Sequence, residues 1–454
     1  MRISRYGKSG PRLLGLLLGT SMLASSALMP TQVQAQDVAP ITIVINQSPW
    51  FDGFRCIVET YEEDTGNVVE LDVNPFAGSL EKQRNSVRAA DGLYDILIMN
   101  SGWYSEMYHG GFVTPITDID ADFTLDPGVY DHDNTIYHDA ETGAPSPETG
   151  KLMSMPINPN IPLLLYREDL YEEHGLKVPE TFEQLLANAK ALHNPPEMYG
   201  IVQRGARGPH TVAYDFYPYL YGHGGSIFQD QDNGDFTVTL NSPEGMEALD
   251  YYIQLATEAG HPNTASQDQA QVIQAMTTGK AGHIITVIAA WPQMDDVNKS
   301  IVVDKVNLAL PPSKEGLPSA PGLGHWLGGI SHNVPAERQQ GAVEFFKWFQ
   351  TPEAQGQYAE CGGVPVSAAA YESDMAEERE FRWMGPMEAG LPLAVNIYTF
   401  PEAAEVIAIL ELELNRAIAG ETSTAVALNT MAEQIHEVMA RHGYETGTLE
   451  PLAE

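Results

Sequence analysis

Residues 41–99 alternate between strand and helix patterns, and this alternation constrains the fold more than any other feature of the sequence. Segments 41–45, 68–73 and 94–99 are rich in β-branched and other apolar residues, which is typical of buried strands. A stretch with helical spacing separates each segment from the next. Strands joined through helices form right-handed crossovers in a largely parallel sheet. We therefore predict an α/β fold whose ligands gather at the carboxyl ends of the strands.

Composition and charge exclude several classes of protein. The chain of 454 residues holds 61 acidic and 24 basic side chains, a formal net charge of −37. A nucleic-acid binder needs clustered Lys and Arg, and no such cluster follows residue 12, so no nucleic-acid partner is expected. Beyond the N-terminus no apolar run approaches the roughly 18 residues that a membrane-spanning helix needs. The 43% of hydrophobic residues indicates a globular chain of two or three domains.

The first 35 residues carry the pattern of an export signal. Four basic residues precede an apolar stretch over 13–28, and Val33-Gln34-Ala35 supplies a small-x-small cleavage site. We predict that residues 1–35 are removed on export. No cysteine lies near the cleavage point, so we expect an exported protein that is not a lipoprotein.

The sequence lacks the motifs of common enzymes and cofactor sites. There is no Gly-x-Ser-x-Gly nucleophile turn, and the zinc-helix pattern that begins at His436 has Ala440 where its second ligand belongs. Segment 230–235 is one residue short of a calcium loop and is interpreted as a hairpin turn. The His- and Asp-rich segment 131–139 has loose spacing, which favours a solvated loop over a metal site. We therefore expect no catalytic residue, no metal and no cofactor.

Aromatic and amide side chains gather instead at strand ends and at three expected crossings between lobes. The crossings are indicated by the prolines of 156–162 and 311–321 and by the glycines and proline of 362–365. Aromatic faces stack on the C–H faces of sugar rings, and amides bond their hydroxyls. Together these residues favour a carbohydrate pocket over the alternative that each ring packs in a core.

The chain resembles the solute-binding proteins of ATP-driven sugar importers, the group that includes the maltose-binding type. The segments that carry the resemblance are 94–100, 110–116, 155–170, 181–186, 279–282 with Trp291, and 346–365. The resemblance implies a type II periplasmic-binding-protein fold of two lobes, each a mixed, mostly parallel sheet flanked by helices, joined by three crossings that act as hinges. The N-terminal lobe would comprise 36–157 and 322–363, and the C-terminal lobe 158–321 and 364–454.

The resemblance also implies a monomeric periplasmic component of an ABC transporter. It would bind a carbohydrate, whether a mono- or oligosaccharide or a polyol, between the lobes and deliver it to the permease subunits in the membrane. The residues it places at the cleft are Trp50, Asp52, Asn100, Ser101, Asn160, Tyr214, Tyr217, Trp291, Trp326 and Tyr398. Family members often carry a carboxylate where Asn100 and Asn160 stand, which leaves the ligand open. The alternatives are a non-sugar solute on the same scaffold, such as a polyamine, betaine or phosphorylated polyol, and a secreted enzyme.

Two further expectations concern single side chains. Cys56 falls on the first expected helix and Cys361 ends the helix before the third crossing, so both should belong to the N-terminal lobe. We predict a disulfide between them, and the alternative is two separately buried thiols. Trp291 follows an expected strand over 283–290, so we predict that its indole stacks on a sugar ring at the carboxyl edge of the sheet. The alternative is that Trp291 fills the core under the strand end.

Overall fold

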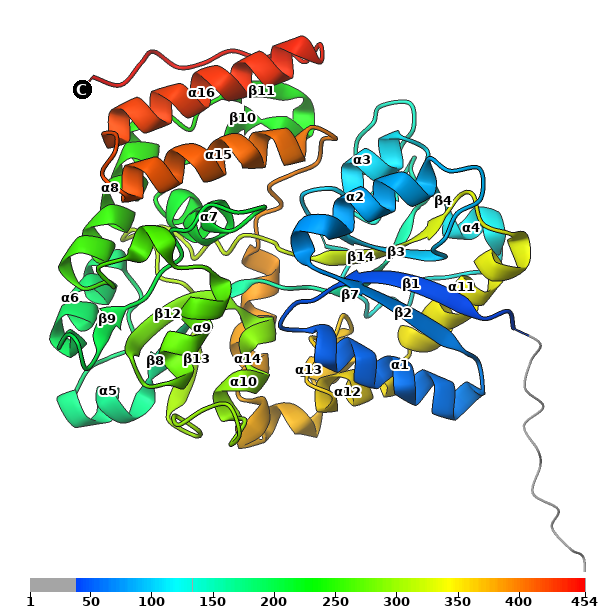
Figure 1. Ribbon diagram of the computed structural model, residues 1–454, viewed down its shortest axis with the longest axis horizontal. Helices are drawn as coiled ribbons and strands as arrows, with labels where there is room; N and C mark the ends of the chain where they lie inside the picture. Colours follow the sequence, from blue (N-terminus) through cyan, green and yellow to red (C-terminus); the bar gives the residue numbers. More distant parts are fainter. Residues whose placement is uncertain (1–37, 133, 454) are drawn as a thin grey trace, which may run out of the picture. The chain divides into compact units, whose positions relative to one another are not determined.

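The computed structural model describes residues 38–132 and 134–453 (Figure 1). The expected export signal lies outside the described residues, as does Asp133 of the His- and Asp-rich segment. The described residues fall in one compact unit that contains two larger sheets. No described helix is both long enough and apolar enough to cross a membrane.

The sheet of the N-terminal lobe confirms the parallel arrangement expected for residues 41–99. Its strands are β1 (Ile41–Asn46), β2 (Val69–Asn74), β3 (Ile96–Asn100), β4 (Val113–Thr114), β7 (Ser154–Asn158) and β14 (Trp326–Ser331). They lie in the order β2–β1–β3–β14–β4, and β7 also pairs with β14. β1 runs parallel to β2 and β3, whereas β14 runs antiparallel to its three partners.

The sheet of the C-terminal lobe has the order β13–β8–β12–β9. Its strands are β8 (Pro162–Arg167), β9 (Tyr199–Ile201), β12 (Ala281–Val287) and β13 (Val306–Ala309). β9 and β12 are parallel, and β8 is antiparallel to both β12 and β13. Antiparallel pairs thus outnumber parallel ones in both sheets, so the sheets are mixed as expected but not mostly parallel. The reason is that β8 and β14 each follow a crossing from the other lobe. The chain then enters the sheet at the edge where the neighbouring strands end, so it runs in the opposite direction to them.

Helices cover the sheets of both lobes (Figure 1). Those of the N-terminal lobe are α1 (Phe51–Thr65), α2 (Phe76–Val87), α3 (Tyr104–His109), α4 (Ile116–Ile119), α11 (Ala336–Phe349) and α12 (Pro352–Glu360). α1 buries Phe54, Ile57, Val58 and Tyr61, whose helical spacing places them on one face. It ends where Gly66 takes a left-handed φ of 74°, a conformation that favours glycine.

Most of the remaining helices belong to the C-terminal lobe. They are α5 (Glu168–His174), α6 (Phe182–Leu192), α7 (Val212–Gly222), α8 (Pro243–Glu258), α9 (Gln269–Thr277), α10 (Pro292–Asp295), α14 (Met384–Gly390), α15 (Ala403–Ile418) and α16 (Thr424–Arg441). The capping box of Thr181 and Gln184 opens α6. Segment 230–235 forms the expected hairpin, between β10 (Phe228–Asp230) and β11 (Asp235–Val238).

The end of the N-terminal lobe is fixed by close packing and by a disulfide. Cys56 on α1 and Cys361 just after α12 are bonded, with their Cα atoms 5.7 Å apart. A Cβ on Gly53 would lie 2.6 Å from the backbone nitrogen of Gly363, so only glycine lets α1 approach this segment. Residues 366–368, which lead into α13 (Ala368–Tyr371), still hydrogen-bond to residues 128–130. The chain therefore remains attached to the N-terminal lobe for several residues after Gly363.

Candidate functional site

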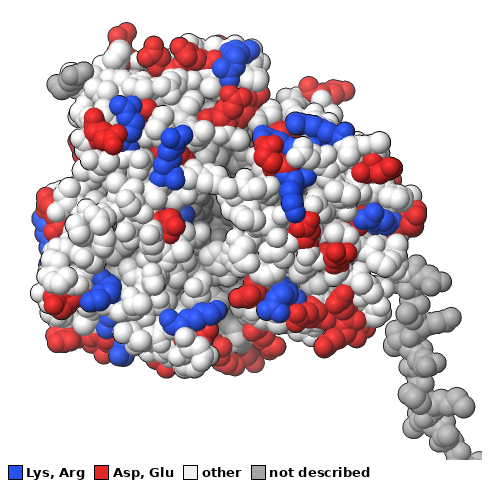
Figure 2. Space-filling view, viewed as in Figure 1, with Lys and Arg blue, Asp and Glu red and all other residues white. Residues whose placement is uncertain are grey.

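A cavity of about 1140 Å³ lies where strands of both sheets end. Its lining includes Asn46, Asn100 and Val287, which are the last residues of β1, β3 and β12. Figure 2 shows a hollow near the middle of this face, with acidic side chains spread over the surface around it. The cavity therefore occupies the sheet edge at which the strand order predicts a ligand.

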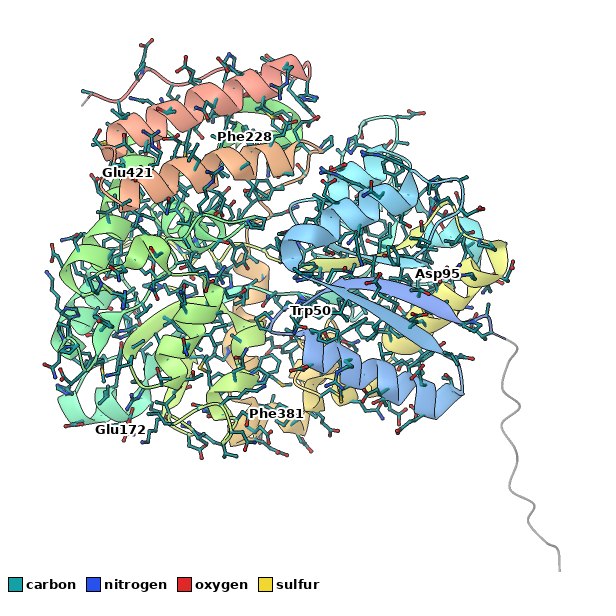
Figure 3. All side chains as sticks on the ribbon, in the orientation of Figure 1. Trp50, Asp95, Glu172, Phe228, Phe381 and Glu421 are labelled. Carbon is teal, nitrogen blue, oxygen red and sulfur yellow. A yellow bond between two sulfur atoms is a disulfide. The ribbon has the colours of Figure 1, made fainter. Side chains whose placement is uncertain are left out.

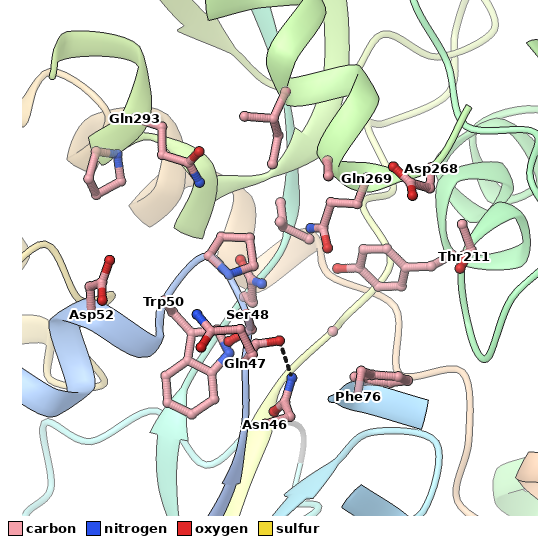
Figure 4. A pocket seen from close by; sticks show the side chains of 18 of the residues that line it. Asn46, Gln47, Ser48, Trp50, Asp52, Phe76, Thr211, Asp268, Gln269 and Gln293 are labelled. Carbon is pink, nitrogen blue, oxygen red and sulfur yellow. Dashed lines mark hydrogen bonds between the residues drawn. The ribbon is translucent and has the colours of Figure 1, made fainter. Parts of the chain in front are cut away.

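The wall from the N-terminal lobe combines amides with aromatic rings. Asn46 ends β1, Gln47 and Ser48 follow it, and Trp50 lies at the edge of the lobe that faces the C-terminal lobe (Figures 3 and 4). The ring centroids of Trp50 and Trp326 are 5.5 Å apart, and Phe76 lies 5.8 Å from Trp326 in an edge-to-face arrangement. Phe76 and Trp326 hold each other in place, because edge-to-face packing is favourable between aromatic side chains.

The wall from the C-terminal lobe is mainly polar. Asp268 and Gln271 form a capping box at the start of α9, and this fixes the turn that faces the cavity. Gln269, Gln293 and Thr211 extend the polar wall opposite the loop that follows β1 (Figure 4). Amide and hydroxyl groups of this kind both donate and accept hydrogen bonds.

Arg204 and Asp215 form a buried ion pair at the cavity. Each side chain is 3% exposed, and Nε of Arg204 lies 3.3 Å from Oδ1 of Asp215. Burial raises the pKa of Asp215, while the charge of Arg204 and hydrogen bonds from the Arg204 backbone and from Tyr252 oppose the rise. Arg204 lines the cavity and supplies N–H donors to it.

Six buried polar atoms on five residues at the cavity have no hydrogen-bond partner among the described residues. They are Asn46 Oδ1, Ser48 Oγ, Trp50 Nε1, both Nε and Nη2 of Arg204, and His210 Nε2, and all five residues line the cavity. Trp50 and Arg204 offer donors, whereas Asn46 offers an acceptor and Ser48 offers both. Buried polar atoms are normally paired, so the set suits a ligand whose groups both donate and accept.

Six of the ten residues expected at the cleft line this cavity: Trp50, Asp52, Asn100, Asn160, Tyr214 and Trp326. Ser101 is buried beside Asn100, and its backbone nitrogen donates to His325. Tyr217 and Tyr398 are buried with their hydroxyls in contact, and both rings pack against His210. They support a residue of the cavity wall without being part of the wall.

The structure places Trp291 away from the cavity, although its neighbours Pro292 and Gln293 line it. β12 ends at Val287, earlier than expected, because residues 288–290 turn into a 3₁₀ helix. Oδ1 of Asn160 accepts the backbone N–H of Ala289 at 3.3 Å and holds this turn. The turn rotates Trp291 toward Glu380, whose carbonyl accepts its indole N–H at 3.2 Å. This position agrees with the alternative expectation, in which Trp291 packs under the strand end.

Three parts of the cavity wall were not predicted from the sequence. Phe76 follows Pro75 directly after β2, and this position at a strand end was a usable signal. The capping box of Asp268 and Gln271 was a second usable signal. His210 lies in a loop with no periodicity, and no sequence pattern marks it.

Comparisons with known proteins agree on one family. A family model described as "Bacterial extracellular solute-binding protein" matches residues 46–356. The mannitol-binding protein of Pseudomonas aeruginosa is 22% identical over 80% of this chain and 84% of its own length. A solute-binding protein of an ABC transporter from Agrobacterium radiobacter, solved with ribitol, has a TM-score of 0.76 at 24% identity and covers 89% of this chain and 99% of its own. The maltose-bound MalE3 of T. maritima also has a TM-score of 0.76, at 20% identity, covering 88% and 99%.

Proposed function

Because the chain belongs to the bacterial extracellular solute-binding proteins, we propose that it is the periplasmic binding component of an ABC transporter for a polyol or a related carbohydrate. The observation that carries this proposal is the mixture of unpartnered donors and acceptors at the cavity. A hydroxyl group can pair with a donor such as Trp50 Nε1 and with an acceptor such as Asn46 Oδ1. A ligand with a hydroxyl on every carbon can form hydrogen bonds with such a wall along its whole length.

An open-chain polyol suits the cavity better than a sugar that depends on stacking. Trp50 and Trp326 are 1% and 5% exposed, and each ring packs against other aromatic rings. Little ring face is therefore left for stacking, and hydrogen bonds would supply most of the selectivity. The mannitol-binding and ribitol-bound relatives support the same choice.

We also propose how the protein is exported and how it delivers its ligand. It is a monomeric binding protein without catalytic activity, made in the cytoplasm with an export signal at 1–35 that is removed, and it is not lipid-anchored. Its lobes have the bounds expected from the sequence, 36–157 with 322–363 and 158–321 with 364–454, except that residues 366–368 stay with the N-terminal lobe. The lobes close on the ligand by rotation at the crossings. The closed form then delivers the ligand to the permease subunits.

A thermal-shift panel followed by calorimetric titration tests this proposal. The panel contains ribitol, D-mannitol, maltose, spermidine, glycine betaine and glycerol 3-phosphate, at millimolar concentrations or below, where general stabilisation by osmolytes is small. We expect ribitol or D-mannitol to raise the Tm most, since a ligand at 100 times its Kd stabilises the folded state by about 2.7 kcal/mol. A shift only with spermidine or betaine would assign a cationic solute, and the carboxylates of Asp52, Asp268 and Asp296 at the cavity would then become its partners.

A further inference from the structure

His210 occupies a loop that the C-terminal lobe holds in an unusual conformation. Its φ of 78° lies in the left-handed region, which residues other than glycine rarely adopt. Glu411 on α15 is the anchor, because its carboxylate accepts backbone N–H groups of Gly208, Thr211, Val212 and Ala213. Four hydrogen bonds donated to one buried carboxylate keep the loop, and His210 with it, at the cavity.

Three tyrosines fix the orientation of the His210 ring. Its centroid lies 5.2 Å from that of Tyr214, 5.8 Å from Tyr398 and 5.9 Å from Tyr217. The three tyrosine rings are buried themselves, so the imidazole has little room to turn. A ring held in this way presents the same nitrogen atoms to the same neighbours.

The hydrogen bonds around Asn100 assign the two ring nitrogens. Oδ1 of Asn100, on the N-terminal lobe, accepts the backbone N–H of Gly102 at 3.1 Å and lies 3.3 Å from Nδ1 of His210. Because Oδ1 is an acceptor, Nδ1 of His210 must carry the proton. Burial and the charge of Arg204 lower the pKa of His210 to about 3, so the ring is neutral and Nε2 keeps its lone pair.

Nε2 of His210 is buried and has no partner among the described residues, and the ring lines the cavity. We propose that His210 is a ligand-binding residue that joins the two lobes: Nδ1–H donates to Asn100, and Nε2 accepts a hydrogen bond from a ligand hydroxyl. This inference rests on the proposed function for its hydroxyl-bearing ligand. A second hydrogen bond between the lobes, from Oγ of Ser105 to the carbonyl of Thr399 at 3.1 Å, reinforces the contact that His210 makes.

The inference predicts the tautomer of His210, and ¹⁵N NMR of histidine-labelled protein measures it without any ligand. We expect Nδ1 to be protonated and Nε2 to have the shift of an unprotonated nitrogen. In Asn100→Ala this preference should weaken, because the acceptor for Nδ1–H is lost. Protonation at Nε2 in the wild-type protein, or an unchanged preference in Asn100→Ala, would overturn the contact between His210 and Asn100.

The proposed hydrogen bond from a ligand hydroxyl to Nε2 of His210 is tested with D-mannitol and ribitol. Addition of the polyol that binds should move the Nε2 resonance, and His210→Phe should lower its affinity at least tenfold. His223→Phe is the matched control, because the His223 ring is also packed against aromatic rings, those of Phe182 and Tyr251, but does not line this cavity. Affinity of His210→Phe within twofold of wild type would overturn the ligand role. If neither polyol binds the wild-type protein, the proposed function fails together with the ligand role, and the tautomer measurement still decides the lobe contact.

Discussion

The guanidinium of Arg382 lies 4.3 Å from the centroid of the Trp291 ring. The same guanidinium donates to Asp295 at 2.7 Å and to the carbonyl of Val306. Trp291 is thus covered on one face by a cation and bonded through its indole N–H to Glu380. These contacts tie α10 to the segment 379–382, which follows the third crossing in sequence.

Replacement of Trp291 by Ala should therefore lower stability and leave binding nearly unchanged. Removing a buried tryptophan typically costs about 3 to 5 kcal/mol, and the cation–π contact with Arg382 is lost with it. We expect a clear fall in Tm by calorimetry, with the Kd for the identified polyol within about twofold of wild type. A tenfold weaker Kd with an unchanged Tm would restore Trp291 as a stacking platform.

For Phe76 we expect the opposite, a loss of binding, because its ring lines the cavity and is only partly buried. Phe76→Ala should weaken polyol binding about tenfold, or about 1.4 kcal/mol, by opening the wall and loosening Trp326 behind it. Phe112→Ala is the matched control, since Phe112 is also partly buried in the N-terminal lobe but lies against His332 and Arg88. Equal affinities of the two variants in titration calorimetry would exclude a role for Phe76 in binding.

The disulfide between Cys56 and Cys361 should stabilise the fold without taking part in binding. It closes a loop with a sequence separation of 305, and the chain-entropy model gives a contribution of about 6 kcal/mol for such a loop, less any strain. We expect the double variant Cys56→Ser, Cys361→Ser to unfold at lower denaturant concentration and to bind with wild-type affinity. Two free thiols titrating in unfolded, non-reduced wild-type protein would contradict the bond.

The sequence predicted the parts of the site that depend on backbone order. Asn46 and Asn100 end parallel strands, and strand ends at one sheet edge must converge. Trp291 was expected at the same edge for the same reason, but a single 3₁₀ turn after Val287 changed the direction of its side chain. His210 depends on Glu411, which lies about 200 residues away in the sequence. Such contacts arise only from tertiary packing, and no local pattern contains them.

Glu411 should make stability depend on pH in an unusual direction. Burial raises the pKa of this carboxyl to about 7, although four backbone N–H groups partly oppose the rise. In the unfolded chain the pKa is near its ordinary value of 4.5. Between pH 4.5 and 7 the folded state therefore keeps a proton on Glu411 that the unfolded chain has lost. The stabilising contribution of Glu411 to the free energy of unfolding is complete below about pH 4.5 and is lost as the pH rises through 7.

Glu411→Gln should flatten this part of the pH profile. The difference between wild type and variant should change by on the order of 1 to 3 kcal/mol between pH 4.5 and 8, measured by urea unfolding at several pH values. Neighbouring groups do not titrate in this range, because the pKa of His210 is about 3 and those of Tyr217 and Tyr398 are raised well above 10. Glu413→Gln is the control, since Glu413 is equally buried on α15 but is paired with Arg416 and does not hold the loop. The same pH-dependent change in both variants would show that the effect does not come from the loop that carries His210.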